Sequence, residues 1–175
     1  MLVVVLVGSL VVINLIFTLG VIKRLREHTE LLRGSFDPVA IEAGTEIGEF
    51  VSVTVDGERI AHESFTEETT VAFFAPDCRP CQEKLPKLAA YGKSIPGGRD
   101  RVLAVVVASA DLAADFVALL RPVAHVVVEE PAGPMAAAFG IRAFPALLSV
   151  APNHSGRLVV KAGTVDMDRP ATVSA

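Results

Sequence analysis

The sequence predicts an α/β domain in which helices cover a mixed central sheet, preceded by a short β extension and a single apolar helix. Two observations carry this prediction. Apolar, strand-like runs alternate with helical spacing between about residues 70 and 139, and two further strand-like runs joined by a turn follow at 146–150 and 157–161. With 175 residues, the chain has room for one domain of ordinary size and an appendage.

Residues 1–22 form the appendage and contain no charged side chain. Because about 20 apolar residues suffice to span a bilayer as a helix, we expect a transmembrane anchor here. A cleavable signal peptide fits less well, since the stretch lacks a basic start and a small-residue cleavage site. Residues 23–48 are expected to form a short helical stalk ended by Gly34, followed by a linker.

The domain itself is expected over residues 49–166, with a frayed tail at 167–175. Valine alternates with polar residues from position 51 to 55, and the pair Asp56-Gly57 follows as a hairpin signal. A return strand is expected at 59–62. The resulting hairpin is the predicted β extension, which we expect to cover an edge of the sheet.

The remaining elements follow from apolar runs and helical spacing. Buried strands are predicted at 70–75, 101–108 and 125–128, because each is a near-continuous apolar run. Helices are predicted between and after them at 82–93, 111–120 and 131–139. Ser109 is the expected cap of the second helix and Pro122 its stop.

The motif Cys78-Arg79-Pro80-Cys81 lies between the first buried strand and the first helix, and holds the only two cysteines of the chain. A thiol at a helix N-terminus is stabilised as a thiolate by the helix dipole and unpaired N–H groups. A second thiol one turn later can resolve a mixed disulfide formed by the first. The motif therefore predicts a reversible dithiol/disulfide switch.

Two other roles for these cysteines are less consistent with the sequence. Structural zinc normally takes four ligands, and the chain offers no second cysteine pair and only scattered histidines. A purely structural disulfide would close so short a loop that it would remove little entropy from the unfolded chain. We therefore expect no metal, and no cofactor other than the Cys78–Cys81 pair itself.

Residues 71–81, together with Glu83, Leu85 and Pro86, resemble the active-site stretch of TlpA-like thiol-disulfide oxidoreductases, membrane-tethered members of the thioredoxin superfamily. Residues 139–146 resemble their second hallmark, in which a cis proline, here Pro145, faces the two cysteines. The resemblance implies a thioredoxin-like three-layer sandwich. The anchor, stalk and extended N-terminal strand also resemble MauD-like proteins.

The resemblance implies a role for each residue of the site. Cys78 would attack the partner sulfur and Cys81 would resolve the mixed disulfide. Substrate contacts are expected from Pro145, Phe144, Pro80 and Arg79.

The sequence departs from the family pattern at three positions, namely Ala72, Asp77 and Phe74, of which the last replaces another tryptophan of the family. Ala72 stands where thioredoxins keep a buried acid, so Glu129 and Glu130 are candidates for a proton acceptor of Cys81, or else solvated loop carboxylates. Asp77 stands where a tryptophan usually precedes the first cysteine; its charge opposes thiolate formation, whereas that of Arg79 favours it.

These features predict a membrane-anchored thiol-disulfide oxidoreductase that reduces or isomerises disulfides of partner proteins and draws on a thiol electron donor. The mild net charge of −4, without a basic stripe, indicates no nucleic-acid partner. Two alternatives stay open: a peroxiredoxin-like peroxidase, and a non-catalytic thioredoxin-fold binding module in cofactor or enzyme maturation.

Two signals disagree about the side of the cell membrane on which the domain lies. Basic residues at 23–26 follow the apolar segment and favour the cytoplasm. TlpA-like domains work outside the cytoplasmic membrane, where disulfides persist. We expect a single-pass protein with an extracytoplasmic domain.

Overall fold

The computed structural model describes Gly8, Asn14 and residues 41–167. Most of the expected anchor at 1–22, the stalk after it, and residues 168–175 of the expected tail lie outside this part of the chain. Within the described residues, no helix combines the length and the apolar character that crossing a bilayer requires.

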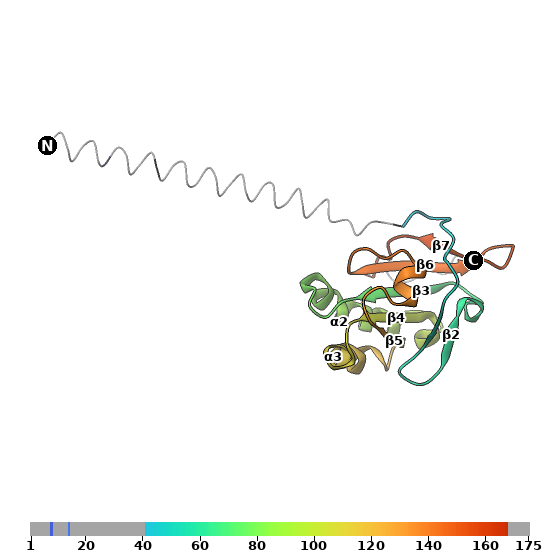
Figure 1. The fold of residues 1–175 in the computed structure, drawn as a ribbon, viewed down its shortest axis with the longest axis horizontal. Helices are drawn as coiled ribbons and strands as arrows, with labels where there is room; N and C mark the ends of the chain where they lie inside the picture. Colours follow the sequence, from blue (N-terminus) through green and yellow to red (C-terminus); the bar gives the residue numbers. More distant parts are fainter. Residues whose placement is uncertain (1–7, 9–13, 15–40, 168–175) are drawn as a thin grey trace. The chain divides into compact units, whose positions relative to one another are not determined.

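A five-stranded sheet in the order β5-β4-β3-β6-β7 forms the centre of the fold (Figure 1). Its strands are β3 (Thr69–Phe74), β4 (Val102–Val107), β5 (His125–Glu129), β6 (Ala146–Pro152) and β7 (Leu158–Ala162). β3, β4 and β5 are parallel, whereas β6 and β7 pair antiparallel. The five predicted core strands and the mixed sheet are confirmed, with strand ends within two residues of expectation.

Two hydrophobic cores lie on opposite faces of this sheet. Helices α2 (Arg79–Ser94) and α3 (Ala110–Leu120) pack on one face, against side chains such as Phe74 of β3. Helix α4 (Pro134–Ala138) and the segment around Phe50 pack on the other, against Phe73. Because neighbouring residues of a strand point to opposite faces, β3 contributes to both cores. The structure is thus the three-layer sandwich that the sequence predicts.

The ends of two helices add detail to the prediction. α4 begins at Pro134 instead of 131, because residues 130–133 form a turn closed by a 2.9 Å hydrogen bond from the Gly133 N–H to the Glu130 carbonyl. Ser109 is the N-cap of α3, as expected, but its side chain makes no capping hydrogen bond. α3 ends at Leu120, just before Pro122.

The predicted hairpin is confirmed as a separate two-stranded antiparallel sheet of β1 (Val51–Val53) and β2 (Arg59–Ala61). Gly57 supplies the turn with a positive φ of 85°, which glycine adopts without strain. A short 3-10 helix, η1 (His62–Ser64), follows β2. The N–H of Val55 donates a 2.8 Å hydrogen bond to the carbonyl of Val126, which joins the hairpin to β5.

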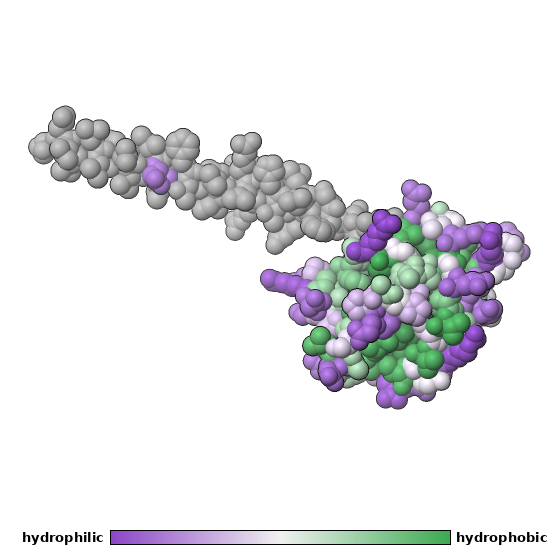
Figure 2. Space-filling model, in the orientation of Figure 1, coloured by the Kyte–Doolittle hydropathy of each residue, from purple (hydrophilic) through white to green (hydrophobic). Residues whose placement is uncertain are grey.

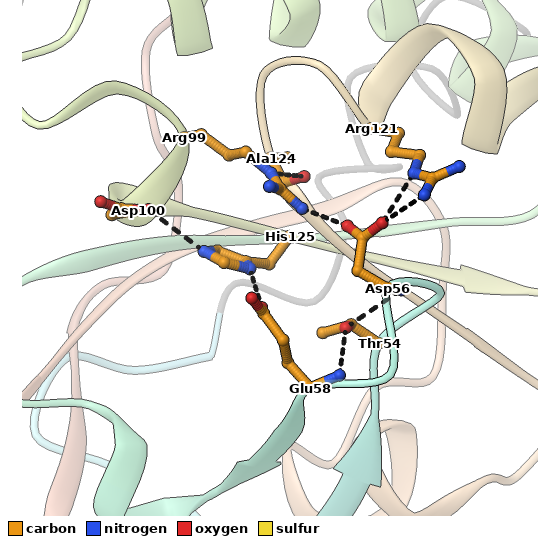
Figure 3. Close-up of polar contacts among 8 residues, drawn as sticks. All are labelled: Thr54, Asp56, Glu58, Arg99, Asp100, Arg121, Ala124 and His125. Carbon is orange, nitrogen blue, oxygen red and sulfur yellow. Dashed lines mark hydrogen bonds and ion pairs between the residues drawn. The ribbon is translucent and has the colours of Figure 1, made fainter.

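A cluster of charged side chains fastens the hairpin tip to the domain (Figure 3). Asp56 accepts a 2.7 Å hydrogen bond from Arg121 Nε, at the end of α3, and pairs with Arg99 of the 3-10 helix η2 (Gly98–Arg101). Glu58 Oε2 lies 2.7 Å from His125 Nδ1, at the start of β5. The Arg121 hydrogen bond, aided by the charges of Arg121 and Arg99, lowers the pKa of the Asp56 carboxyl.

The end of the expected linker packs on the sheet. A β-bridge pairs Glu46 with Val159, and the Ile47 N–H donates a 2.9 Å hydrogen bond to the Leu158 carbonyl. Ile47 is 6 % exposed and belongs to the α4-side core. Residues 44–47 therefore cover the outer edge of β7, which protects that edge from other strands.

Gly92 of α2 permits close packing against the segment before β5, because a Cβ there would lie 2.7 Å from the Val123 carbonyl oxygen. We expect Gly92→Ala to destabilise the fold by about 1–3 kcal/mol through overpacking. Intrinsic helix propensity alone predicts the opposite, because alanine stabilises a helix by about 1 kcal/mol relative to glycine. Denaturant unfolding measures the difference, and Lys93→Ala, at an exposed neighbouring position, should stay near zero. A higher unfolding midpoint for Gly92→Ala would contradict the packing.

Candidate functional site

The two cysteines occupy different environments at the start of α2. Cys78 is the N-cap residue and is half-buried, whereas Cys81, one turn into the helix, is completely buried. The Cys81 N–H donates a 3.0 Å hydrogen bond to the Cys78 carbonyl, and the Gln82 side chain donates one of 2.7 Å to the Pro76 carbonyl. The loop and the first helical turn therefore form one hydrogen-bonded unit that presents only Cys78 outward.

The loop before β6 meets this unit. Both cysteines are free thiols, and Cys78 Sγ donates a hydrogen bond of 3.4 Å to the carbonyl oxygen of Phe144. The Phe144–Pro145 peptide bond is cis, as predicted, and Pro145 is buried. The structure thus brings Phe144 next to Cys78 from 66 positions along the chain.

Burial raises the pKa of the Cys81 thiol to about 12. The hydrogen bond and the charge of Cys78 add to this shift, and so does the charge of Asp77, while a hydrogen bond from the Ala75 backbone opposes it. At neutral pH the Cys81 sulfur is therefore protonated. Any reaction that uses it as a nucleophile must first remove this proton.

A groove of about 990 Å³ opens beside Cys78. Its walls are the loop after β3, the end of β4 with the first turn of α3, the turn before α4, and the segment from Gly140 to Phe144. Most lining side chains are apolar, and Leu112 at the rim is 66 % exposed. The groove can therefore accept an apolar chain segment whose sulfur reaches Cys78.

The other predicted substrate contacts lie outside the lining of this groove. Arg79 is fully on the solvent side of α2, where its Nε lies 3.2 Å from Glu83 Oε1. Pro80 is exposed in the first helical turn, and Pro145 is covered by its neighbours. Of the four expected residues, Phe144 is the one that forms part of the groove surface and contacts Cys78.

The two candidate proton acceptors have different surroundings. Glu129 is 8 % exposed and accepts hydrogen bonds from the backbone N–H groups of Met135 (3.0 Å) and Ala136 (2.7 Å). It caps α4 on the sheet face opposite Cys81, so it is neither a solvated loop carboxylate nor placed to accept the Cys81 proton. Glu130 is exposed and lines the groove.

Sequence reasoning missed three groove residues that come from separate elements, namely Leu112, Glu130 as a lining group, and Arg142. Leu112 sits at the first turn of a helix whose buried positions are Ala113, Phe116 and Leu120. An apolar side chain outside the buried positions of its helix is the feature of the sequence that could have indicated a surface contact at Leu112. Among the described residues, no group of three or more His, Cys, Asp or Glu side chains could hold a metal ion.

No protein-family model and no curated protein matches this sequence. Solved structures do match in fold, and three of them illustrate the likeness. The thioredoxin domain of a Bacteroides vulgatus thiol-disulfide oxidoreductase has a TM-score of 0.57 at 13 % identity, over 73 % of this chain and 92 % of that one. DsbF of Mycobacterium tuberculosis has a TM-score of 0.54 at 23 % identity, over 68 % and 87 %.

StoA of Bacillus subtilis matches with a TM-score of 0.51 at 17 % identity, over 69 % of this chain and 92 % of that one. At identities this low, the structural likeness shows the fold alone, and the activity has to be argued from the site. The chain therefore has a thioredoxin-like fold, with structural neighbours among the thiol-disulfide oxidoreductases.

Proposed function

We propose that this protein is a thiol-disulfide oxidoreductase that exchanges the Cys78–Cys81 dithiol with disulfides of partner proteins. The observation that carries the proposal is the arrangement of the two sulfurs. Cys78 faces an apolar groove beside the Phe144 carbonyl, and Cys81 lies buried one turn behind it. The first sulfur can reach a partner, and the second can reach only the first.

In the reducing direction, the Cys78 thiolate attacks one sulfur of the partner disulfide. The partner S–S bond breaks, a mixed disulfide with Cys78 forms, and the released partner sulfur takes up a proton. Cys81 then loses its proton and attacks Cys78 Sγ. The mixed disulfide breaks, the second partner sulfur leaves as a thiol, and the protein holds a Cys78–Cys81 disulfide. Two electrons have passed to the partner, and a thiol donor would restore them.

Formation of the mixed disulfide helps the second step. In the reduced protein, the hydrogen bond and the charge of Cys78 both raise the pKa of Cys81. Once Cys78 is bonded to the partner it carries no charge, so these two causes are removed and the pKa of Cys81 falls. Burial, the largest cause, remains. The pKa of the Cys81 thiol therefore falls before the second step, in which this thiol must lose its proton.

The proposal includes a TlpA-like, membrane-anchored form. Residues 1–22 carry no charge and are long enough to span a bilayer, which supports an anchor. The resemblance of the cysteine and cis-proline segments to TlpA-like proteins supports an extracytoplasmic domain that reduces or isomerises disulfides there.

Trapping tests the exchange directly. With Cys81→Ser, attack by Cys78 should proceed and resolution should stop, so a mixed disulfide with a disulfide-containing protein substrate should accumulate. Non-reducing electrophoresis and mass spectrometry of the adduct measure it. Cys78→Ser should trap nothing, because buried Cys81 cannot reach a partner. Equal trapping by both variants, or by neither, would reject the proposed mechanism.

The pH dependence of Cys81 alkylation tests its environment. A raised pKa means less thiolate at any given pH, and only the thiolate reacts. In Cys78→Ser, the Cys81 alkylation rate should climb about tenfold per pH unit up to about pH 10 without levelling. In denaturant it should level near the ordinary value of 9.0. A native profile that also levels there would show that burial does not control this thiol.

A matched pair of leucines tests the groove. Leu112 lines it, whereas Leu119, 44 % exposed on the same helix, is not part of its lining. Leu112→Ser should lower kcat/KM for a protein disulfide roughly tenfold, since burying a leucine is worth about 1.5–3 kcal/mol. The kcat/KM for a small disulfide reagent that does not fill the groove should stay unchanged. If Leu119→Ser has the same effect, the groove does not bind the substrate.

A further inference from the structure

The groove beside Cys78 is mostly apolar but carries a few charged side chains. Apart from the thiol, its ionisable lining residues are Asp77, Glu130 and Arg142. On the side of the domain where Figure 1 labels α2 and α3, hydrophobic and hydrophilic residues adjoin on the surface (Figure 2). The position of each charge along the groove therefore bears on which partner segment fits it.

The sheet order separates Glu130 from the other two charges. Glu130 directly follows β5 and Cys78 follows β3, and β4 lies between these parallel strands. Because neighbouring strands are about 4.8 Å apart, the ends of β5 and β3 lie roughly 10 Å from each other. Asp77 is the neighbour of Cys78 in the chain. Arg142 lies two positions before Phe144, whose carbonyl contacts the thiol. The Cys78 end therefore holds one charge of each sign, and the β5 end holds only the negative charge of Glu130.

The surroundings hold Glu130 in place without neutralising it. The preceding Glu129 accepts two hydrogen bonds from α4, and the Glu130 carbonyl accepts one of 2.9 Å from the Gly133 N–H. Ala132 of the same turn has a positive φ of 63°, which a residue other than glycine adopts where its surroundings impose it. Within the described part of the chain, no hydrogen bond or ion pair engages the Glu130 side chain. A preformed carboxylate without a partner thus lines the groove.

The neighbouring elements offer no cation to offset Glu130. The charged residues of α3, Asp111 and Asp115, are both exposed and negative. Arg121, just after α3, pairs with Asp56 of the hairpin tip. β4, α4 and the turn before α4 contain no basic residue. The β5 end of the groove therefore attracts a cation and repels an anion.

We propose that the groove selects partner segments with a lysine or arginine about three residues from the reactive cysteine, and that Glu130 is the residue that selects them. An extended chain advances about 3.3 Å per residue, so three residues cover the roughly 10 Å between the two ends. The residues between them would contact the apolar rim at Leu112, in the first turn of α3. The inference rests on the proposed function, because it names the class of disulfide that the thiol pair exchanges with.

Kinetics with short synthetic peptides test the proposal, using the reduced full chain in a non-ionic detergent. Each peptide has one central cysteine joined by a disulfide to a chromophoric thiol of low pKa. Cys78 attacks the peptide sulfur, the chromophoric thiolate leaves, and Cys81 then releases the peptide as a thiol. The peptides carry lysine or glutamate either about three residues from the cysteine on both sides, or next to it. The readout is the ratio of the second-order rate constants of the lysine and glutamate peptides, because changes in thiol reactivity cancel in it.

Variants assign the preference to one carboxylate. With the unmodified chain, lysine three residues away should react about two- to tenfold faster than glutamate, as expected of an exposed charge pair. Glu130→Gln should bring this ratio towards one, and Glu130→Lys should bring it below one. Glu63→Lys changes the net charge equally, but it lies in η1 outside the groove lining and should leave the ratio unchanged. Added salt should reduce the ratio, because ions screen the contact.

Two results would overturn the proposal while the thiol exchange itself stands. The first is a ratio that Glu130→Lys leaves unchanged, and the second is a ratio that is largest when lysine is next to the cysteine. Absence of thiol release from every peptide would reject the proposed exchange, and this inference with it.

Discussion

The pairing of β3 with β6 is the constraint on which the candidate site depends. Their antiparallel register places Phe73 opposite Ala146. The chain leaves β3 a few residues before Cys78, and it enters β6 directly after Pro145. Because these two ends coincide at one edge of the sheet, the thiol and the Phe144 carbonyl come within 3.4 Å. A different register would separate the halves of the site while leaving each strand buried, so sheet pairing and not local sequence assembles it.

Burial gives the two cysteine side chains different reactivities. Cys81 belongs to the core beneath α2 and α3, where desolvation raises its pKa to about 12, while Cys78 lies at the groove. The inward thiol is therefore buried and protonated at neutral pH, and less reactive than an exposed thiol. In the proposed exchange, this asymmetry makes Cys78 the first sulfur to react and Cys81 the second. It also explains why the pair can lie at the surface without exposing two reactive sulfurs.

Much of the fold could be predicted because its signals are local. Apolar runs identified β3 to β7, a strand-to-helix step identified the cysteine motif, and the cis bond at Pro145 followed from a family resemblance. The features that escaped prediction depend on distant partners. Residues 44–47 carry no strand pattern and pair because the edge of β7 is open. Glu129 is polar yet buried because the N-terminus of α4 lies against it and donates hydrogen bonds to its carboxylate. The valines of β1 alternate as any strand would, and only the tip contacts decide which face is outward.

Strand β5 links the N-terminal hairpin to the groove beside Cys78. Near its start, the Val126 carbonyl accepts the hydrogen bond from Val55 of the hairpin, and His125 lies against Glu58. At its end, Glu129 holds the N-terminus of α4, and the turn that follows lines the groove. β5 is paired with β4 along its whole length. The hairpin and one wall of the groove are therefore both attached to β5, a strand that is hydrogen-bonded into the central sheet.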